Sequence, residues 1–231
     1  MESKVVGIIP LGGNATRMKG IPKFLLPCNL NTSLLDNTVN IFNKNNIHHI
    51  IAGVTNTNSI ILGDNFKIDK LTLNTKTMSE TCHKITTELD QSNTNYKSIL
   101  IMPDTFFVIK NEIADMIEML DEYDIVTIVW KIKDYQIGKV GQCKLNSDKT
   151  IADVIDKDPN CDYSHFWGVI GWKSNMNTHI NPEWETIGNI IRKSVELNIK
   201  VGAIICESDY YDCGTYPEYF KMIEHVVLPK L

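Results

Sequence analysis

The chain has 231 residues, of which 43% are hydrophobic, and its formal net charge is -5 at pH 7. This length and apolar content suit one large globular domain, or two small ones, with a real core. The acidic balance and the lack of a long basic run argue against a broad cationic surface for nucleic acid, but a few cations can still hold a small anion.

The first half of the chain alternates between apolar runs and helical patterns. Strands are expected at residues 5–10, 49–54, 70–73, 97–102 and 124–131. Ser33 precedes one helical pattern, and a shorter helix is expected between the second and third strands. The segment 77–80, TMSE, has the form of a capping box that opens a helix to about Leu89, and residues 113–120 form an amphipathic helix. This βαβα order predicts a mostly parallel sheet with helices on both faces.

After residue 131 the pattern changes. Three further strands, at residues 140–145, 150–155 and 166–172, are joined by short turns without helices, which predicts antiparallel additions to the sheet. A helix over residues 187–195, a strand at 201–206 and a final helix over 216–227 complete the chain. We therefore expect a single α/β domain over residues 1–231.

The stretch 8–27, IIPLGGNATRMKGIPKFLLP, leaves a buried strand through a glycine pair that two cations follow. Gly12 and Gly13 permit a tight turn whose N–H groups can bind an anion, and Arg17 and Lys23 add charge. The spacing is neither that of a P-loop nor GxGxxG. Taken alone, such a turn could equally be a solvated loop.

Two aspartates follow strands or strand-like runs. Asp104 comes directly after the strand at 97–102, and Asp212 lies between a strand region and the last helix. Ligands of doubly wound sheets bind beyond the carboxyl ends of the strands, and Mg²⁺ prefers carboxylate and phosphate oxygens. Asp104 could also serve as a turn or cap residue. A helix start with Thr215 as N-cap explains Thr215 and Glu218 but leaves Asp212 unexplained.

Together these segments resemble the sugar-1-phosphate nucleotidyltransferase family, whose signature is close to GGxGTRxxPxTxxxPKxxxxV. The likeness covers about the whole chain and implies a single Rossmann-like domain of the GT-A type, with residues 1–131 as the nucleotide-binding part and 132–231 as the sugar-phosphate-binding part. It also implies catalytic roles for Arg17 and Lys23 on the phosphates. Asp104 and Asp212, the latter in a motif similar to D-x-GT-x-E, would hold Mg²⁺ (or Mn²⁺).

The same resemblance implies the substrate sites. The nucleotide would contact residues of the first loop and of the helix start, namely Leu11, Gly12, Gly13, Asn14, Thr16, Met78, Ser79 and Glu80. The segment IDKDP is similar to the family's EKP motif, so Lys157 would meet the sugar phosphate and Asp156 would replace the usual Glu. The segment FWGV is similar to the strand that lines the sugar pocket and contributes Trp167 and Gly168.

The implied reaction joins an NTP and a sugar 1-phosphate into an NDP-sugar and pyrophosphate. Ala15 replaces a motif glycine, and the short spacing from Arg17 to Lys23 is closer to cytidylyl- and guanylyltransferases. A transferase acting on a non-hexose phosphate, or an inert nucleotide- or sugar-binding homologue, therefore remains as an alternative. A GT-A glycosyltransferase would normally carry an Asp-x-Asp motif, whereas the Asp104 segment has one Asp.

Six irregularly spaced cysteines, without a CxxC pair, are typical of reduced thiols in a cytoplasmic protein. The apolar run near the N-terminus is too short for a membrane span, so no membrane partner is expected. The expected partners are the NTP and the sugar 1-phosphate, and the expected state is a monomer or a small homo-oligomer.

Overall fold

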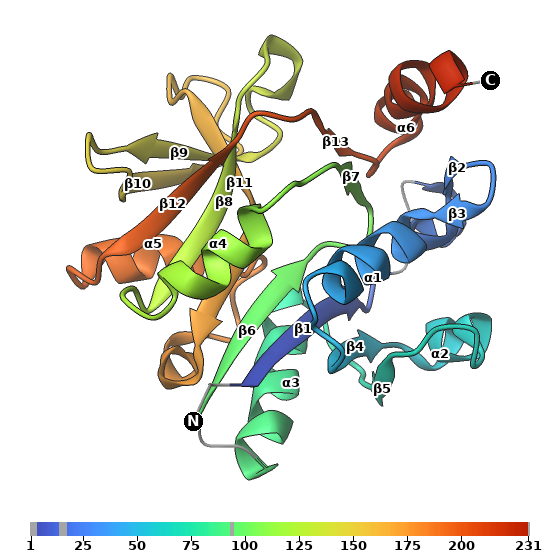
Figure 1. Ribbon diagram of the computed structural model, residues 1–231, viewed down its shortest axis with the longest axis horizontal. Helices are drawn as coiled ribbons and strands as arrows, with labels where there is room; N and C mark the ends of the chain where they lie inside the picture. The colour runs from blue at the N-terminus through green and yellow to red at the C-terminus, as the bar shows by residue number, and fades with distance from the viewer. Residues whose placement is uncertain (1–3, 14–17, 93–94, 231) are drawn as a thin grey trace.

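The computed structural model describes residues 4–13, 18–92 and 95–230, and its centre is one sheet of nine strands (Figure 1). Its strands are β1 (Lys4–Leu11), β4 (Ile50–Val54), β5 (Asp69–Thr72), β6 (Tyr96–Ile101), β8 (Ile125–Lys131), β9 (Gly141–Leu145), β10 (Ile151–Asp156), β11 (His165–Lys173) and β12 (Val201–Cys206). Two small two-stranded ribbons pair β2 (Pro27–Asn29) with β3 (Thr32–Ser33) and β7 (Thr105–Phe107) with β13 (Tyr210–Asp212).

The α-helices are α1 (Leu34–Lys44), α2 (Asn56–Leu62), α3 (Met78–Ser92), α4 (Glu112–Met119), α5 (Asn189–Glu196) and α6 (Tyr216–Met222). A π-helical turn, Ile223–Val227, and a 3-10 turn, Leu228–Lys230, extend α6. Further 3-10 turns lie at Lys23–Leu25, Asp134–Gln136 and Ser174–His179. No helix in the described ranges is long and apolar enough to cross a membrane.

The sheet combines parallel and antiparallel strands as the sequence predicted. β6, β1, β4 and β5 form a parallel block, and β8 and β12 form a second parallel pair. β11 joins the two because it pairs antiparallel with both β6 and β8, and the β9–β10 hairpin pairs with its beginning. Strands from before and after residue 131 thus share one sheet.

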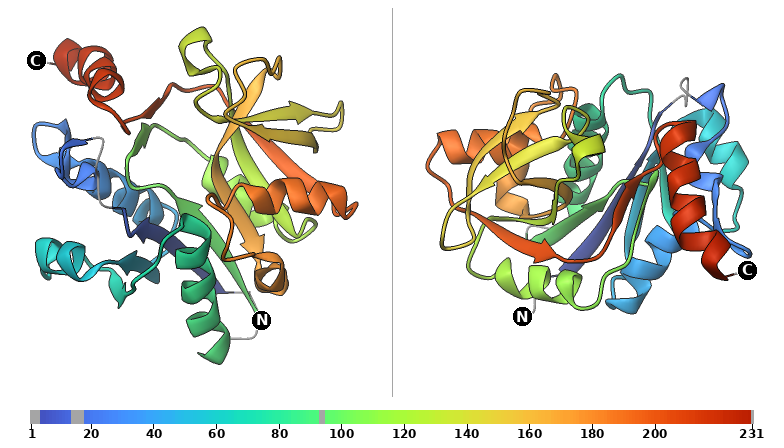
Figure 2. Two further views of the ribbon diagram at one scale, coloured as in Figure 1. Left: turned by 180° about the vertical axis from the view of Figure 1, so that it is seen from behind. Right: turned by 90° about the horizontal axis from the view of Figure 1, so that it is seen from above.

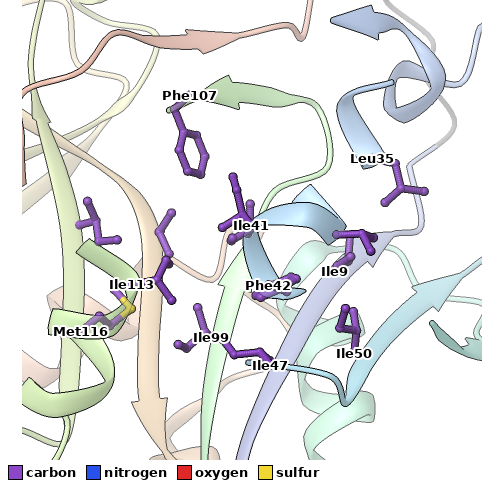
Figure 3. Packing of buried hydrophobic residues seen from close by; sticks show 14 of the residues in the cluster. Ile9, Leu35, Ile41, Phe42, Ile47, Ile50, Ile99, Phe107, Ile113 and Met116 are labelled. Carbon is purple, nitrogen blue, oxygen red and sulfur yellow. The ribbon is translucent and has the colours of Figure 1, made fainter. Parts of the chain in front are cut away.

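Helices cover both faces of this sheet, which confirms the predicted α/β class (Figure 2). On one face, α1 and α4 bury side chains such as Phe42 and Met116 against Ile9 and Ile99 (Figure 3). On the other face, α3 and α5 pack through residues such as Ile85 and Ile190. Burying this apolar surface on two sides stabilises the sheet that carries the loops of the site.

Helices α1 and α3 differ in how their first turns are capped, and a capping box was predicted only for α3. Ser33 forms a full box with Asp36 at the start of α1. At the start of α3 the box is half formed, because the Glu80 N–H donates to Thr77 Oγ1 at 3.0 Å but Glu80 Oε2 accepts from the Lys76 N–H, not from Thr77. The Glu80 carboxylate therefore binds the backbone of Lys76, one residue before Thr77, its expected partner.

The β7–β13 ribbon was not predicted, and it decides the geometry of the site. Its strands are only three residues long and pair antiparallel, with Asp212 opposite Thr105. Phe107 and Tyr210 stack with their ring centroids 5.6 Å apart and anchor the ribbon to Trp130 of β8. The ribbon bridges the parallel block and the second half of the sheet (Figure 1).

Candidate active site

A cleft of about 220 Å³ opens at the carboxyl ends of β1 and β6. Residues 10–13, 22–24, 75–78 and 102–104, with Thr81, line it. Leu11, Gly12, Gly13 and Met78 from the predicted nucleotide site are among them, and so are Lys23 and Asp104. The structure therefore gathers the glycine loop, one predicted catalytic cation and one predicted metal ligand around a single hollow.

The two predicted metal ligands lie side by side because of the β7–β13 ribbon. The Cys213 N–H donates to the Asp104 carbonyl at 2.8 Å, immediately beyond the pairing of Asp212 with Thr105. Asp104 precedes β7 and Asp212 ends β13. Backbone pairing between segments far apart in sequence thus sets the spacing of the carboxylate pair.

Asp212 is the member of this pair whose negative charge is disfavoured by its surroundings. Burial raises the pKa of its carboxyl above the ordinary value, and the neighbouring charges of Asp104 and Glu218 raise it further. The Gly214 N–H, which donates to Asp212 Oδ1 at 2.9 Å, and the charge of Lys23 lower this pKa only in part. Among the described residues, the charges of Asp104 and Glu218 therefore outweigh that of Lys23 at the Asp212 carboxyl.

Among the described residues, Lys23 is a cation that lies beside the pair. It begins the 3-10 turn Lys23–Leu25, whose entry is fixed by Pro22, and its Nζ lies 3.2 Å from Asp104 Oδ2. A side chain at Gly214 would place its Cβ 3.7 Å from Lys23 Nζ and 2.9 Å from Asp212 Oδ1. A glycine at this position therefore leaves room for the Asp212 carboxylate.

The two carboxylates suit a divalent cation whose remaining ligands come from the substrate and from water. Within the described ranges, no group of three or more His, Cys, Asp or Glu side chains is placed to hold a metal by itself. Two carboxylates remain, and hard oxygen ligands of this kind suit Mg²⁺ or Mn²⁺, with phosphate oxygens and water filling the other positions. The excess charge at Asp212 is what such a cation would neutralise.

Hydroxyl groups form the wall of the cleft opposite the glycine loop. Thr75 Oγ1 and Thr81 Oγ1 are 2.6 Å apart, and Thr81 Oγ1 donates to the Thr77 carbonyl at 3.1 Å. A Cβ at Gly12 would lie 3.5 Å from both Thr75 Oγ1 and Thr81 Oγ1, so any larger side chain would fill this narrow space. The loop and the threonines together define the width of the cleft.

The other two residues predicted in this wall have local roles. Ser79 is fully buried, and its hydroxyl has no hydrogen-bond partner among the described residues. Glu80 accepts from the Lys76 N–H at 2.8 Å and pairs with Lys84 Nζ at 3.0 Å, which lowers the pKa of its carboxyl. Neither side chain lines the cleft, so contact of either with a nucleotide stays a prediction.

The predicted sugar-site residues lie around β9, β10 and β11. Asp156 ends β10, and the exposed Lys157 adopts a left-handed backbone conformation, with its N–H donating to the Val140 carbonyl at 3.1 Å. Trp167 is 7% exposed and packs closely against Gly141 and Gly188, where Cβ atoms would collide with its indole.

Gly168 is the extra residue of a β-bulge in β11. A Cβ there would lie 2.6 Å from the Tyr210 ring and 2.7 Å from Trp130. This glycine therefore lets the aromatic anchor of the β7–β13 ribbon approach the sheet. None of the four predicted sugar-site residues lines the cleft, so their contact with a substrate stays a prediction.

Four residues of the opening loop, Asn14, Ala15, Thr16 and Arg17, lie outside the described residues. The predicted roles of Asn14, Thr16 and Arg17, and the effect of Ala15 on the loop, therefore stay predictions.

Asn58 is a site residue that sequence reasoning missed. It lies in α2, is 7% exposed, and donates from Nδ2 to the Leu11 carbonyl at 2.6 Å and to the Gly13 carbonyl at 3.5 Å. In a trans peptide the N–H points opposite to the carbonyl. By holding the Leu11 carbonyl, Asn58 turns the Gly12 N–H away from α2.

We expect Asn58→Asp to raise the KM for a nucleoside triphosphate roughly tenfold, which corresponds to about 1.4 kcal/mol. The substitution would set a carboxylate against two carbonyl oxygens and disturb the loop that is expected to bind the phosphates. Initial rates over a range of nucleotide concentrations measure the effect. Asn45→Asp is the matched control, because Asn45 Nδ2 also donates to a backbone carbonyl, that of Ile41 in α1, at 2.8 Å, and Asn45 does not line the cleft. Equal changes in KM for both variants would contradict a specific role of Asn58 in nucleotide binding.

Comparison with known proteins places the fold of this chain among solved structures. No family model matches the chain, and no curated protein matches its sequence. A protein from Bacillus anthracis assigned as a glucose-1-phosphate thymidylyltransferase, in complex with sucrose, shares 14% identity and gives a TM-score of 0.77, covering 96% of this chain and 95% of its own. A UTP-bound UGPase from Acinetobacter baumannii gives 0.78 at 12% identity, covering 97% and 93%. A UDP-glucose pyrophosphorylase complexed with UDP-glucose gives 0.77 at 13% identity, covering 97% and 98%. The chain therefore has the sugar-1-phosphate nucleotidyltransferase fold that its motifs resemble.

Proposed function

We propose that the protein is a Mg²⁺-dependent nucleotidyltransferase that converts an NTP and a sugar 1-phosphate into an NDP-sugar and pyrophosphate. The observation that carries this proposal is the carboxylate pair of Asp104 and Asp212, held by the β7–β13 ribbon and faced by Lys23. Asp104 borders a cleft whose other walls are a glycine loop and a row of threonines, and the segment that carries Asp212 pairs with the backbone of Asp104. The solved structures of the same fold that were crystallised with UTP or UDP-glucose support the same substrate classes.

The chemistry requires no strong base in the protein. A phosphate monoester has a second pKa of about 6, so at neutral pH it is largely a dianion and already a nucleophile. One of its oxygens forms a bond to the α-phosphorus of the NTP as the bond from that phosphorus to the β-phosphate oxygen breaks, and pyrophosphate leaves with the electron pair.

The protein's contribution is to orient two anions and to stabilise charge. Lys23 would stabilise the α-phosphate as negative charge moves to the leaving group, and Arg17 would hold the β- and γ-phosphates. Gly12 and Gly13 would bind phosphate oxygens through backbone N–H groups. Asp104 and Asp212 would hold the divalent cation, which supplies neutralisation of the phosphate charge when it is bound.

A matrix of substrates tests the proposal. Pyrophosphate release should be measured for each NTP against glucose 1-phosphate, other sugar phosphates, and polyol and aminoalkyl phosphates, with Mg²⁺ or with EDTA. We expect release from at least one pair, and loss of release in EDTA. Binding of an NTP by calorimetry without pyrophosphate release for any acceptor would instead identify an inert nucleotide-binding homologue.

A further inference from the structure

An aromatic cage attaches one face of the β7–β13 ribbon to the large sheet. The ring of Tyr210, on β13, lies 4.9 Å from Trp130 of β8 and 5.1 Å from Phe166 of β11 between centroids. The same ring stacks on Phe107 of β7 at 5.6 Å, and Tyr210 is 4% exposed. Tight packing on several sides leaves the Tyr210 ring little freedom to move, so the cage fixes where β13 lies.

Tyr210 and Asp212 share one short strand. Side chains of a strand alternate between its faces, so these two residues, which are two apart in β13, lie on the same side of the ribbon. Tyr210 pairs with Phe107, and Asp212 pairs with Thr105. Burial raises the pKa of the Tyr210 hydroxyl, and the charges of Asp212 and Asp104 raise it further, which agrees with a ring close to both carboxylates. A displaced Tyr210 ring would therefore displace the Asp212 carboxylate.

Gly168 decides how closely the Tyr210 ring can approach the sheet. It is the extra residue of the β-bulge in β11, and a Cβ there would lie 2.6 Å from the Tyr210 ring and 2.7 Å from the Trp130 ring. The three atoms nearest to such a Cβ all belong to these two rings. A side chain at Gly168 would thus push on β13, which carries Asp212, and not on the segment that carries Asp104. The spacing of the two carboxylates would change.

We propose that Gly168 and the Tyr210 ring are positioning residues for the carboxylate pair, and that they set its affinity for a divalent cation. The inference rests on the proposed metal-dependent transfer and deepens it. It differs from the role that the FWGV resemblance implies, in which Gly168 lines a sugar pocket. A bulge beside an active site commonly redirects a strand, and this one makes room for the ring that holds Asp212 in place.

Binding of Mn²⁺ to the protein without nucleotide tests the inference without requiring turnover, and the electron paramagnetic resonance signal of the free ion measures it. The variants are Gly168→Ala and Tyr210→Leu. Gly171→Ala is the matched glycine control, because it lies on the same strand and its Cβ would approach the flexible side chain of Met116, at 2.9 Å from Sδ. Tyr210→Phe keeps the ring and is the control for Tyr210→Leu. The Tm of each protein is recorded in parallel.

We expect Gly168→Ala and Tyr210→Leu to bind Mn²⁺ about tenfold more weakly than the wild type, or weaker still, while both controls stay within about twofold. The difference between Gly168→Ala and Gly171→Ala should persist even if their Tm values fall equally. In turnover, Gly168→Ala should lower kcat and leave the KM for the acceptor unchanged, because the residue acts through Asp212 and not on the sugar.

Wild-type Mn²⁺ affinity in Gly168→Ala and Tyr210→Leu would overturn the inference, as would an equal loss in Gly171→Ala or in Tyr210→Phe. A raised KM for the acceptor with unchanged Mn²⁺ affinity would instead assign Gly168 to the sugar pocket. If Gly168→Ala does not fold, the comparison of Tyr210→Leu with Tyr210→Phe decides. If Mn²⁺ affinity follows the expectation but no acceptor yields pyrophosphate, the positioning role stands and the proposed reaction fails.

Discussion

Replacing Lys23 with methionine is expected to lower kcat for pyrophosphate release by about 10²–10³-fold, as removal of one preorganised charge-stabilising group does in other enzymes. Lys23 Nζ is placed 3.2 Å from Asp104 Oδ2 and beside Gly214, so it faces the carboxylate pair at which the α-phosphate would lie. The effect should fall mainly on kcat, because the charge that the lysine stabilises develops during the reaction. Steady-state rates at saturating substrates measure it.

Lys70→Met controls for the loss of an ion pair as such. Lys70 Nζ also lies 3.2 Å from an aspartate oxygen, that of Asp64, and it lies on β5 away from the cleft. This variant should keep wild-type kcat, and Lys23→Arg, which keeps the charge, should recover part of the rate. A kcat for Lys23→Met within a few-fold of the wild type would contradict the assigned role.

Asp212→Asn is expected to reduce activity to background and, at the same time, to stabilise the metal-free protein. The first effect follows from the loss of one of two carboxylates that would hold the cation. The second follows because an amide at this buried position carries no charge to be repelled by Asp104 and Glu218. A residue whose removal abolishes activity but raises stability is typical of a strained functional site.

The gain in stability should depend on pH with a defined sign. Burial and the neighbouring carboxylates raise the pKa of Asp212 from 3.8 to about 7. A carboxyl with a raised pKa in the folded state loses stability as pH rises from its unfolded value to its folded value, and the loss is complete above that. In EDTA, the difference in Tm between the variant and the wild type should therefore grow between pH 4 and pH 7 and then stay constant. At that plateau, the free energy of unfolding of the variant should exceed that of the wild type by about 1–3 kcal/mol.

Added Mg²⁺ provides an independent readout. Above pH 7 it should raise the Tm of the wild type, because binding to the folded state alone stabilises it, and it should leave Asp212→Asn nearly unchanged. Asp124→Asn serves as a matched control, because Asp124 is an acidic residue that pairs with Lys173 at 3.5 Å, away from the site. If Mg²⁺ stabilised wild type and Asp212→Asn equally, the cation would bind elsewhere.

The large elements of this fold could be predicted from periodicity because each buries a long apolar face. Strand β1 is the continuous buried run that was expected, and helix α4 buries Ile113 and Met116 at the expected helical spacing. The β7–β13 ribbon could not be predicted in the same way. Three-residue strands such as Thr105–Phe107 carry no measurable alternation, and pairing with Tyr210–Asp212 depends on contacts far apart in the sequence.

The residues of the site likewise divide into those that the sequence could predict and those that it could not. Asp104, Lys23 and the glycine pair were located by their places after strands and by the family motif, and the structure brings them to one cleft. Asn58 gave no signal, because an asparagine in a short polar helix is ordinary and its partner carbonyls belong to another element. Its importance appears only when α2 is placed beside the end of β1.

On the ribosome, the two members of the carboxylate pair emerge at different times. Asp104 is synthesised before β8–β12, and Asp212 only after them. The growing chain therefore presents its glycine turn and one carboxylate first, and the second carboxylate arrives when β13 pairs with β7. A cation that needs both carboxylates can bind only after that last pairing, so it cannot guide the early steps of folding. Metal-dependent protection from proteolysis would thus report the final docking event.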